Sequence, residues 1–147
     1  MIILNNYSYI IKKPMDYNKF CDEVLKINPK VRFCGVYTTI NGSMYYKMQK
    51  GIKKIFSDEQ TKDSLVHAYM RWKSRLKVSD LIGIPIYTMT KYPKVNRITL
   101  PCGSNALIMI STEPEFETSE IIDDVCNLRK KYLDPEGYVP PAHQLNF

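Results

Sequence analysis

The hydrophobic positions between Asp16 and Leu133 change period along the chain. They pass from the three-to-four-residue spacing of helices to the alternating or continuous runs of strands. The pattern predicts a helix, a β-hairpin, one long helix, three closely spaced strands and a final helix. We expect these elements at residues 16–27, 31–39, 44–49, 57–77, 86–91, 97–101, 105–111 and 118–133. This order indicates one α+β domain, with a five-stranded, mainly antiparallel sheet flanked by helices.

The first helix and the hairpin after it carry strong local signals. Residues 16–27 place their apolar side chains on one helical stripe, and Asn28-Pro29 ends the helix because proline disfavours helical backbone in the residue before it. Asn41-Gly42 then separates two strand-like segments. Asn-Gly tolerates positive φ at both central positions of a tight turn, so we expect a hairpin there.

The long helix has a clear start and a buried side. Ser57 followed by Gln60 fits a capping box, and we expect the helix to end near Lys77, or at Asp80 at the latest. Acidic residues gather in its first turns and basic residues in its last turns, which suits the helix dipole. The predicted apolar side consists of Leu65, Ala68, Tyr69, Trp72 and Leu76.

The strand at 105–111 is apolar at consecutive positions, so we expect it to be covered on both faces. The strand at 31–39 is nearly as apolar. These two strands belong at the centre of the sheet, which leaves 44–49 and 86–91 for its edges.

The order of elements resembles the roadblock/LC7 group of profilin-like domains. The likeness is carried by the Val31–Gln49 hairpin, the single Ser57–Lys77 helix and the Ile86–Ser111 meander, and it covers residues 16–133. It implies the strand order 2-1-5-4-3, with the long helix on one face and the terminal helices on the other. The chain also resembles stand-alone archaeal proteins. PAS and GAF sensor domains share much of the strand order but usually break the connection after the hairpin into several short helices.

The resemblance also implies a function. Roadblock-like domains commonly dimerise through the middle helix and the edge strand after it, and they act as platforms for small GTPases, motors or other regulators. No motif of the family can be carried over residue by residue, so this role rests on fold alone. A second, semi-apolar patch on the long helix points to the same face. The predicted dimer or partner interface comprises Val66, His67, Met70, Lys73 and Tyr87.

Charge suggests a second kind of partner. The net charge is +6, but residues 47–97 hold twelve Lys/Arg against four Asp/Glu, whereas residues 113–136 hold three against eight. Lysines interleaved with aromatic residues can contact phosphates while the rings stack on bases. The candidate anion or nucleic-acid patch comprises Lys47, Lys50, Lys53 and Lys54, beside Tyr45, Tyr46 and Phe56. The alternative interpretation is an ordinary solvated surface.

A small-ligand sensor is the remaining alternative to a binding platform. Trp72, Tyr69 and Tyr87 would then line a cavity between the sheet and the long helix, although such aromatic residues more often fill a core. This alternative and the platform hypothesis both describe a protein that binds rather than one that catalyses.

Catalytic signals are weak. The four cysteines have no C-x-x-C spacing, the two histidines are far apart, and no glycine-rich phosphate loop is present. We therefore predict no catalytic residue, no metal site and no cofactor.

The ends of the chain and its hydropathy indicate a cytoplasmic protein. The longest apolar runs are far shorter than a membrane span, and the first residues lack the pattern of a signal peptide. We expect an N-terminal arm at 1–15 and a C-terminal tail at 134–147 around the single domain.

Overall fold

The computed structural model describes residues 15–133, so the predicted tail and all but the last residue of the predicted arm lie outside the described residues. Within that range the elements follow the predicted order. They are α2 (Tyr17–Leu25), β1 (Val31–Thr38), β2 (Met44–Met48), α3 (Asp58–Arg75), the 3-10 turn η1 (Leu76–Val78), α4 (Ser79–Ile82), β3 (Thr88–Lys91), β4 (Asn96–Cys102), β5 (Ala106–Thr112) and α5 (Ser119–Tyr132).

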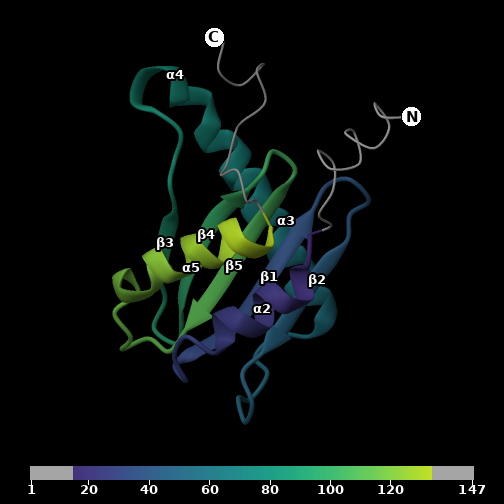
Figure 1. Ribbon diagram of the computed structural model, residues 1–147, viewed down its shortest axis with the longest axis vertical. Coiled ribbons are helices and arrows are strands. Elements are labelled where there is room, and N and C mark those ends of the chain that lie inside the picture. Colours follow the sequence, from purple (N-terminus) through teal and green to yellow (C-terminus); the bar gives the residue numbers. More distant parts are fainter. Residues whose placement is uncertain (1–14, 134–147) are drawn as a thin grey trace, which may run out of the picture.

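The five strands form one antiparallel sheet in the order β2-β1-β5-β4-β3 (Figure 1). The order implied by the resemblance is therefore confirmed. β5 lies at the centre and all seven of its residues are buried, as its continuous apolar run predicted. The edges are β2 and β3, also as predicted.

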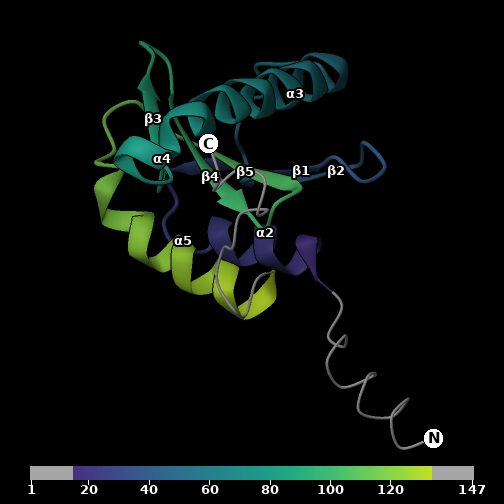
Figure 2. The same ribbon diagram turned by 90° about the horizontal axis from the view of Figure 1, so that it is seen from above.

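The helices lie in two layers, one on each face of the sheet (Figure 2). The larger hydrophobic cluster joins the sheet to α2 and α5 and includes Phe20, Ile110 and Val125. The smaller cluster joins the sheet to α3 and includes Leu65 and Trp72. This arrangement leaves the opposite side of α3 facing away from the sheet.

The start of α3 matches the predicted capping box. The Ser57 hydroxyl accepts from the backbone N–H of Gln60 at 3.1 Å, and the Gln60 side chain accepts from the N–H of Ser57 at 2.9 Å. Two backbone donors at the helix start, which have no partner inside the helix, are satisfied in this way.

The end of α3 differs from the prediction. The α-helix stops at Arg75, the chain tightens into η1, and a further helical turn, α4, follows. The Ser79 hydroxyl donates to the carbonyl of Leu76 at 2.6 Å, and Gly83, at φ +91°, turns the chain out of the helical region. The edge strand β3 accordingly begins at Thr88, two residues later than predicted.

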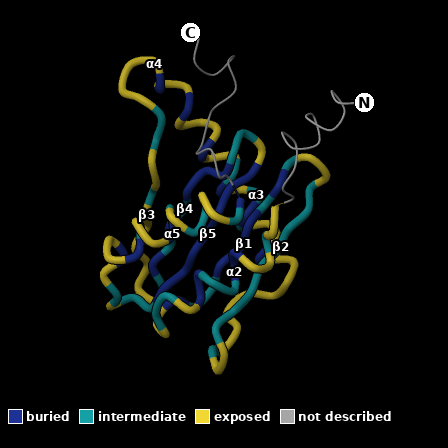
Figure 3. Tube along the Cα trace, in the orientation of Figure 1, coloured by how far each residue is buried: buried dark blue, intermediate teal, exposed yellow. Residues whose placement is uncertain are grey.

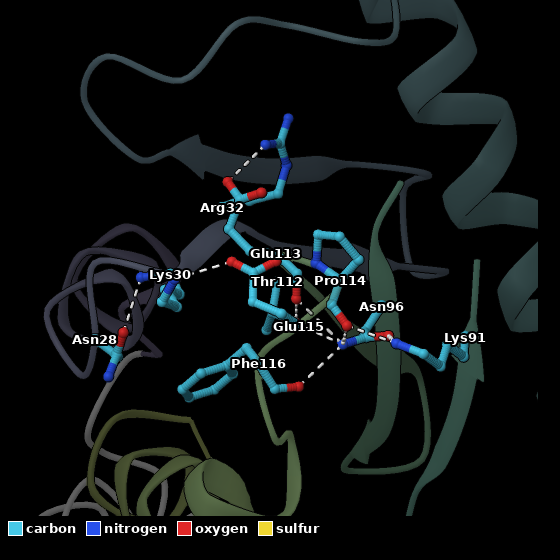
Figure 4. Close-up of polar contacts among 10 residues, drawn as sticks. All are labelled: Asn28, Lys30, Arg32, Lys91, Asn96, Thr112, Glu113, Pro114, Glu115 and Phe116. Carbon is cyan, nitrogen blue, oxygen red and sulfur yellow. Dashed lines mark hydrogen bonds and ion pairs between the residues drawn. The ribbon is translucent and has the colours of Figure 1, made fainter. Parts of the chain in front are cut away.

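One buried asparagine ties β4 to the connection between β5 and α5 (Figure 4). The Asn96 amide nitrogen lies 3.1–3.3 Å from the Thr112 hydroxyl and from the carbonyls of Glu113, Pro114 and Phe116. The Asn96 amide has two N–H groups, so these acceptors share them. Close by, Arg32 of β1 and Glu113 form an ion pair at 2.9 Å. These contacts hold the acidic segment after β5 against the sheet.

Candidate protein interaction surface

The structure places the predicted interface residues of α3 on the side of the helix that faces away from the sheet. The side chains that α3 buries are those of Thr61, Leu65, Ala68 and Trp72. Of the predicted interface residues, His67, Met70 and Lys73 are exposed and Val66 is half-buried; Met70 has 60% of its surface exposed.

The fifth predicted interface residue comes from another part of the chain. Tyr87 is 43% exposed and lies in the connection between α4 and β3, just before the edge strand. The predicted surface therefore draws on two elements, the outer side of α3 and the approach to β3.

An exposed apolar segment at residues 78–89 was not predicted, apart from Tyr87. Between residues 78 and 89 the chain exposes Leu81 (80%), Ile82 (81%) and Ile86 (70%), together with Val78 and Met89. Figure 3 shows exposed chain around α4 and along the way to β3. Of the twelve large hydrophobic residues exposed in the described part of the chain, eight lie between residues 70 and 92. The apolar run around Gly83 was the available signal, but periodicity alone does not separate a buried run from an exposed one.

The edge strand adds unpaired backbone groups to this surface. β3 pairs with β4 on one side only, so within residues 15–133 the outer N–H and C=O groups of β3 have no partner strand. An edge of this kind is a template for a strand from another chain. Exposed apolar side chains and a free strand edge thus occur together in one stretch of sequence.

Solved structures with the same architecture include roadblock/LC7 domains. A roadblock/LC7 domain from Streptomyces avermitilis matches with a TM-score of 0.60 and 9% identity, covering 79% of this chain and 93% of that one. The chain has the roadblock/LC7 fold. No protein-family model and no curated protein matches its sequence.

Two structures of the protein MglB share this roadblock/LC7 fold. MglB from Myxococcus xanthus matches with a TM-score of 0.62 and 11% identity, covering 81% of this chain and 92% of that one. An MglB structure with a tetrameric arrangement matches with a TM-score of 0.55 and 11% identity, covering 78% and 88%. At these identities the likeness establishes the fold.

The candidate anion patch is partly neutralised within the chain. Lys47 lies 3.4 Å from the carboxylate of Asp22, and Lys54 lies 2.7 Å from that of Asp58. Lys50 and Lys53 are exposed. Nucleic-acid binding at these lysines stays a prediction.

The aromatic residues beside that patch are engaged elsewhere. Tyr45 stacks on Tyr17 with ring centroids 4.7 Å apart, and Tyr46 packs on Phe33 while donating a hydrogen bond to Asp58. That hydrogen bond raises the pKa of the Tyr46 hydroxyl. Each of these two rings thus already packs against another aromatic ring of the chain.

Three of the four cysteines, Cys21, Cys34 and Cys102, are buried thiols. Burial, with a contribution from the neighbouring Cys21, raises the pKa of the Cys34 thiol well above its ordinary value of 9.0, which suppresses the reactive thiolate. Among residues 15–133 no group of three or more His, Cys, Asp or Glu is arranged to hold a metal ion. His143 lies outside the described residues.

The aromatic residues of the sensor hypothesis do not share one cavity wall. Trp72 is buried in the cluster beneath α3, and Tyr69 packs against that cluster and against Tyr37, 5.8 Å away between ring centroids. Tyr87 is exposed outside the cluster. Trp72 and Tyr69 therefore fill the core in the way that such residues usually do.

Proposed function

We propose that this chain is a non-enzymatic, cytoplasmic interaction module that forms a homodimer and scaffolds a protein partner, such as a small GTPase or another signalling protein. The proposed contact surface combines the predicted interface residues with the exposed segment at residues 78–89. Its residues are Val66, His67, Met70, Lys73, Tyr87, Leu81, Ile82, Ile86 and Met89.

The exposed apolar segment is the observation that carries this proposal. Scattered apolar side chains on a surface need no explanation, but a concentration of large ones is typical of a contact site. Leu81 and Ile82 leave about four fifths of their surface in water. Covering them with a second protein removes apolar area from water, which is the main favourable term in most association reactions.

Homodimerisation is supported by the free edge of β3 and by the fold. A two-fold axis beside β3 allows the same edge and the same helix side of both copies to meet, as an isologous interface requires. An MglB structure has a tetrameric arrangement on this fold. The class of partner, a small GTPase or another signalling protein, is proposed because the resemblance to roadblock domains implies it.

The absence of an enzymatic role is proposed from the chemistry of the described residues. The Cys34 thiol is buried with a raised pKa, and residues 15–133 hold no cluster suited to a metal. None of the helices in that range is long and apolar enough to cross a membrane, and the cytoplasmic location remains part of the proposal.

The oligomeric state tests the proposal directly. We expect light scattering coupled to size-exclusion chromatography to give a dimer mass that stays constant over a hundredfold range of protein concentration. Ile86→Glu and Met70→Glu each place a charge in the proposed interface and should shift the mass towards the monomer. The matched controls are Ile40→Glu and Met15→Glu, because both residues are comparably exposed but lie on other surfaces.

A clean monomer at the highest concentration would contradict the dimer, and equal effects of Ile86→Glu and Ile40→Glu would contradict its location. The partner is sought by affinity capture with the wild type, Ile86→Glu and Ile40→Glu as parallel baits. A purified small GTPase recovered from that capture should bind the wild type and Ile40→Glu and lose binding to Ile86→Glu.

A further inference from the structure

Arg97 of β4 is held in an unusual environment for a cation. Its guanidinium lies 5.0 Å from the ring centroid of Phe56 and 5.9 Å from that of Tyr92. Among residues 15–133 no carboxylate forms an ion pair with it. Burial lowers the pKa of Arg97; the neighbouring Tyr92 opposes this shift, and the charge of Arg71 adds to it. A half-buried guanidinium held between rings without a counter-ion attracts an anion.

An apolar cavity opens on one side of Arg97. Its volume is about 430 Å³. Its walls come from the loop before α3 and from the turn between β3 and β4. The lining residues are Ile55, Phe56, Tyr92, Pro93, Lys94, Val95 and Arg97. This volume is within the range of pockets that bind small molecules, and mostly apolar walls with a few polar groups are typical of such pockets.

Arg97 also lines a polar groove between the second half of α3 and the strands β3 and β4. Arg71 and Arg75 reach it from the helix, and threonines of both strands form its floor. Its interior holds about 20 Å³, enough for roughly one water-sized group. Neither Arg71 nor Arg75 forms an ion pair among the described residues. Three guanidiniums therefore border one small polar space without a carboxylate.

We propose that this depression binds a small organic carboxylate whose aromatic body fills the apolar cavity and whose carboxylate meets Arg97, with Arg71 and Arg75 supplying further positive charge. The planar fork of a guanidinium matches the two oxygens of a carboxylate. The site lies between α3 and the strands β3 and β4, and its polar groove borders the Trp72 cluster through Ala68 and Met109. None of the three aromatic residues of the sensor hypothesis lines it. The site does not require the chain to dimerise.

The test uses 2-naphthoate as the probe, titrated into the isotope-labelled full chain and followed by NMR. We expect saturable shifts at the Ile55 and Val95 methyl groups and at Arg97 Nε, with a Kd of about 1 mM or tighter. That affinity is typical of a ligand with about thirteen non-hydrogen atoms. The uncharged analogue 2-naphthamide should bind at least about tenfold more weakly, because it cannot form the charge-assisted contact.

Two variants locate the anion contact. Arg97→Gln should weaken 2-naphthoate binding by about tenfold or more. Lys131→Gln makes the same change of charge on α5, on the other side of the sheet, and should bind like the wild type. Dispersed amide spectra and unchanged melting temperatures establish that both variants are folded.

Three results would overturn the proposal. They are the lack of saturable shifts, equal binding of the acid and the amide, and an Arg97→Gln variant that binds like the wild type. A blocked Phe-Asp dipeptide serves as the competing probe. If it binds more than tenfold tighter than 2-naphthoate, the site receives a polypeptide segment and the small-molecule proposal is wrong.

Discussion

At the scale of single residues, Asn96 has the most contacts to lose. It is almost fully buried and supplies the amide donors for a group of carbonyls after β5. Asn96→Leu keeps the branched shape of the side chain but removes both donors. We expect this variant to lose about 2 kcal/mol of unfolding free energy, because buried carbonyls are left without partners. Urea unfolding followed by circular dichroism measures the loss.

The control for this prediction is Asn127→Leu, the same substitution at an exposed position of α5. It should stay within about 0.5 kcal/mol of the wild type. Equal stabilities of the two variants would show that the Asn96 contacts add nothing to folding.

Neither Asn96 nor Arg97 was identified from the sequence as important. A lone asparagine beside a strand has no periodic signal, and the carbonyls that it meets belong to residues 17–20 positions later in the chain. Arg97 looks like an ordinary exposed position of an alternating strand. Its importance comes from its contact with the ring of Phe56, which lies in the loop before α3. Contacts of this kind are set by the tertiary fold.

At the scale of elements, one substitution can measure how much the capping box of α3 contributes to the unfolding free energy. Ser57→Ala removes the hydroxyl that accepts from the Gln60 N–H. We expect a loss of about 1 kcal/mol in unfolding free energy. Ser74→Ala is the control, because it makes the same change at an exposed position inside the same helix. Thermal and urea unfolding should show a loss for Ser57→Ala alone, and a similar loss in both variants would contradict a capping effect.

The elements that the sequence predicted well have strong local causes. β5 was recognised from its continuous apolar run, and the hairpin of β1 and β2 from Asn41-Gly42, although only Gly42 of that pair has a positive φ, +66°. The region at residues 76–88 was predicted less well. No predicted element contained Leu81 and Ile82, whereas the structure places both in α4 with about four fifths of their surface exposed. The residue at which a helix ends also depends on local hydrogen bonds, such as the one that the Ser79 hydroxyl donates to the carbonyl of Leu76. These bonds compete with the backbone bonds that would continue the helix.

At the scale of the whole molecule, the predicted strand order came from the resemblance to roadblock domains. Hydrophobic patterns distinguish central strands from edge strands, but they do not give the order of the strands in the sheet. The proposed interface was also selected partly by resemblance. Met70 and Tyr87 were selected from pattern and analogy, and the structure leaves both exposed. The adjacent segment at residues 78–89 required the three-dimensional arrangement, since its exposure depends on what packs opposite it.

The acidic segment after β5 pairs with basic residues that precede the basic block of residues 47–97. Glu115 lies 2.9 Å from Lys30, and Glu113 lies 2.9 Å from Arg32. Both cations lie outside residues 47–97, so these two ion pairs leave the charge of that block unchanged. Within the block, Lys47 pairs with Asp22 and Lys54 with Asp58.

Ion pairs of this kind make folding sensitive to acid. The ammonium of Lys54, with the hydroxyl of Tyr46, holds the pKa of Asp58 below its ordinary 3.8, and Lys30 lowers the pKa of Glu115 from 4.5. The unfolded chain then binds protons more readily than the folded chain in this range, so stability rises with pH. The contribution is complete above the unfolded values and is lost as pH falls through the lowered, folded-state values.

We therefore expect the unfolding free energy, measured by urea titration between pH 2 and pH 6, to fall as the pH drops below about 4.5. Asp58→Asn should flatten that fall, whereas Asp124→Asn, at an exposed position of α5 without an ion pair among the described residues, should follow the wild type. Salt at about 1 M should reduce the difference between Asp58→Asn and the wild type, because it screens exposed charges. Parallel curves for the wild type and Asp58→Asn would show that the contacts of Asp58 with Lys54 and Tyr46 do not contribute to folding.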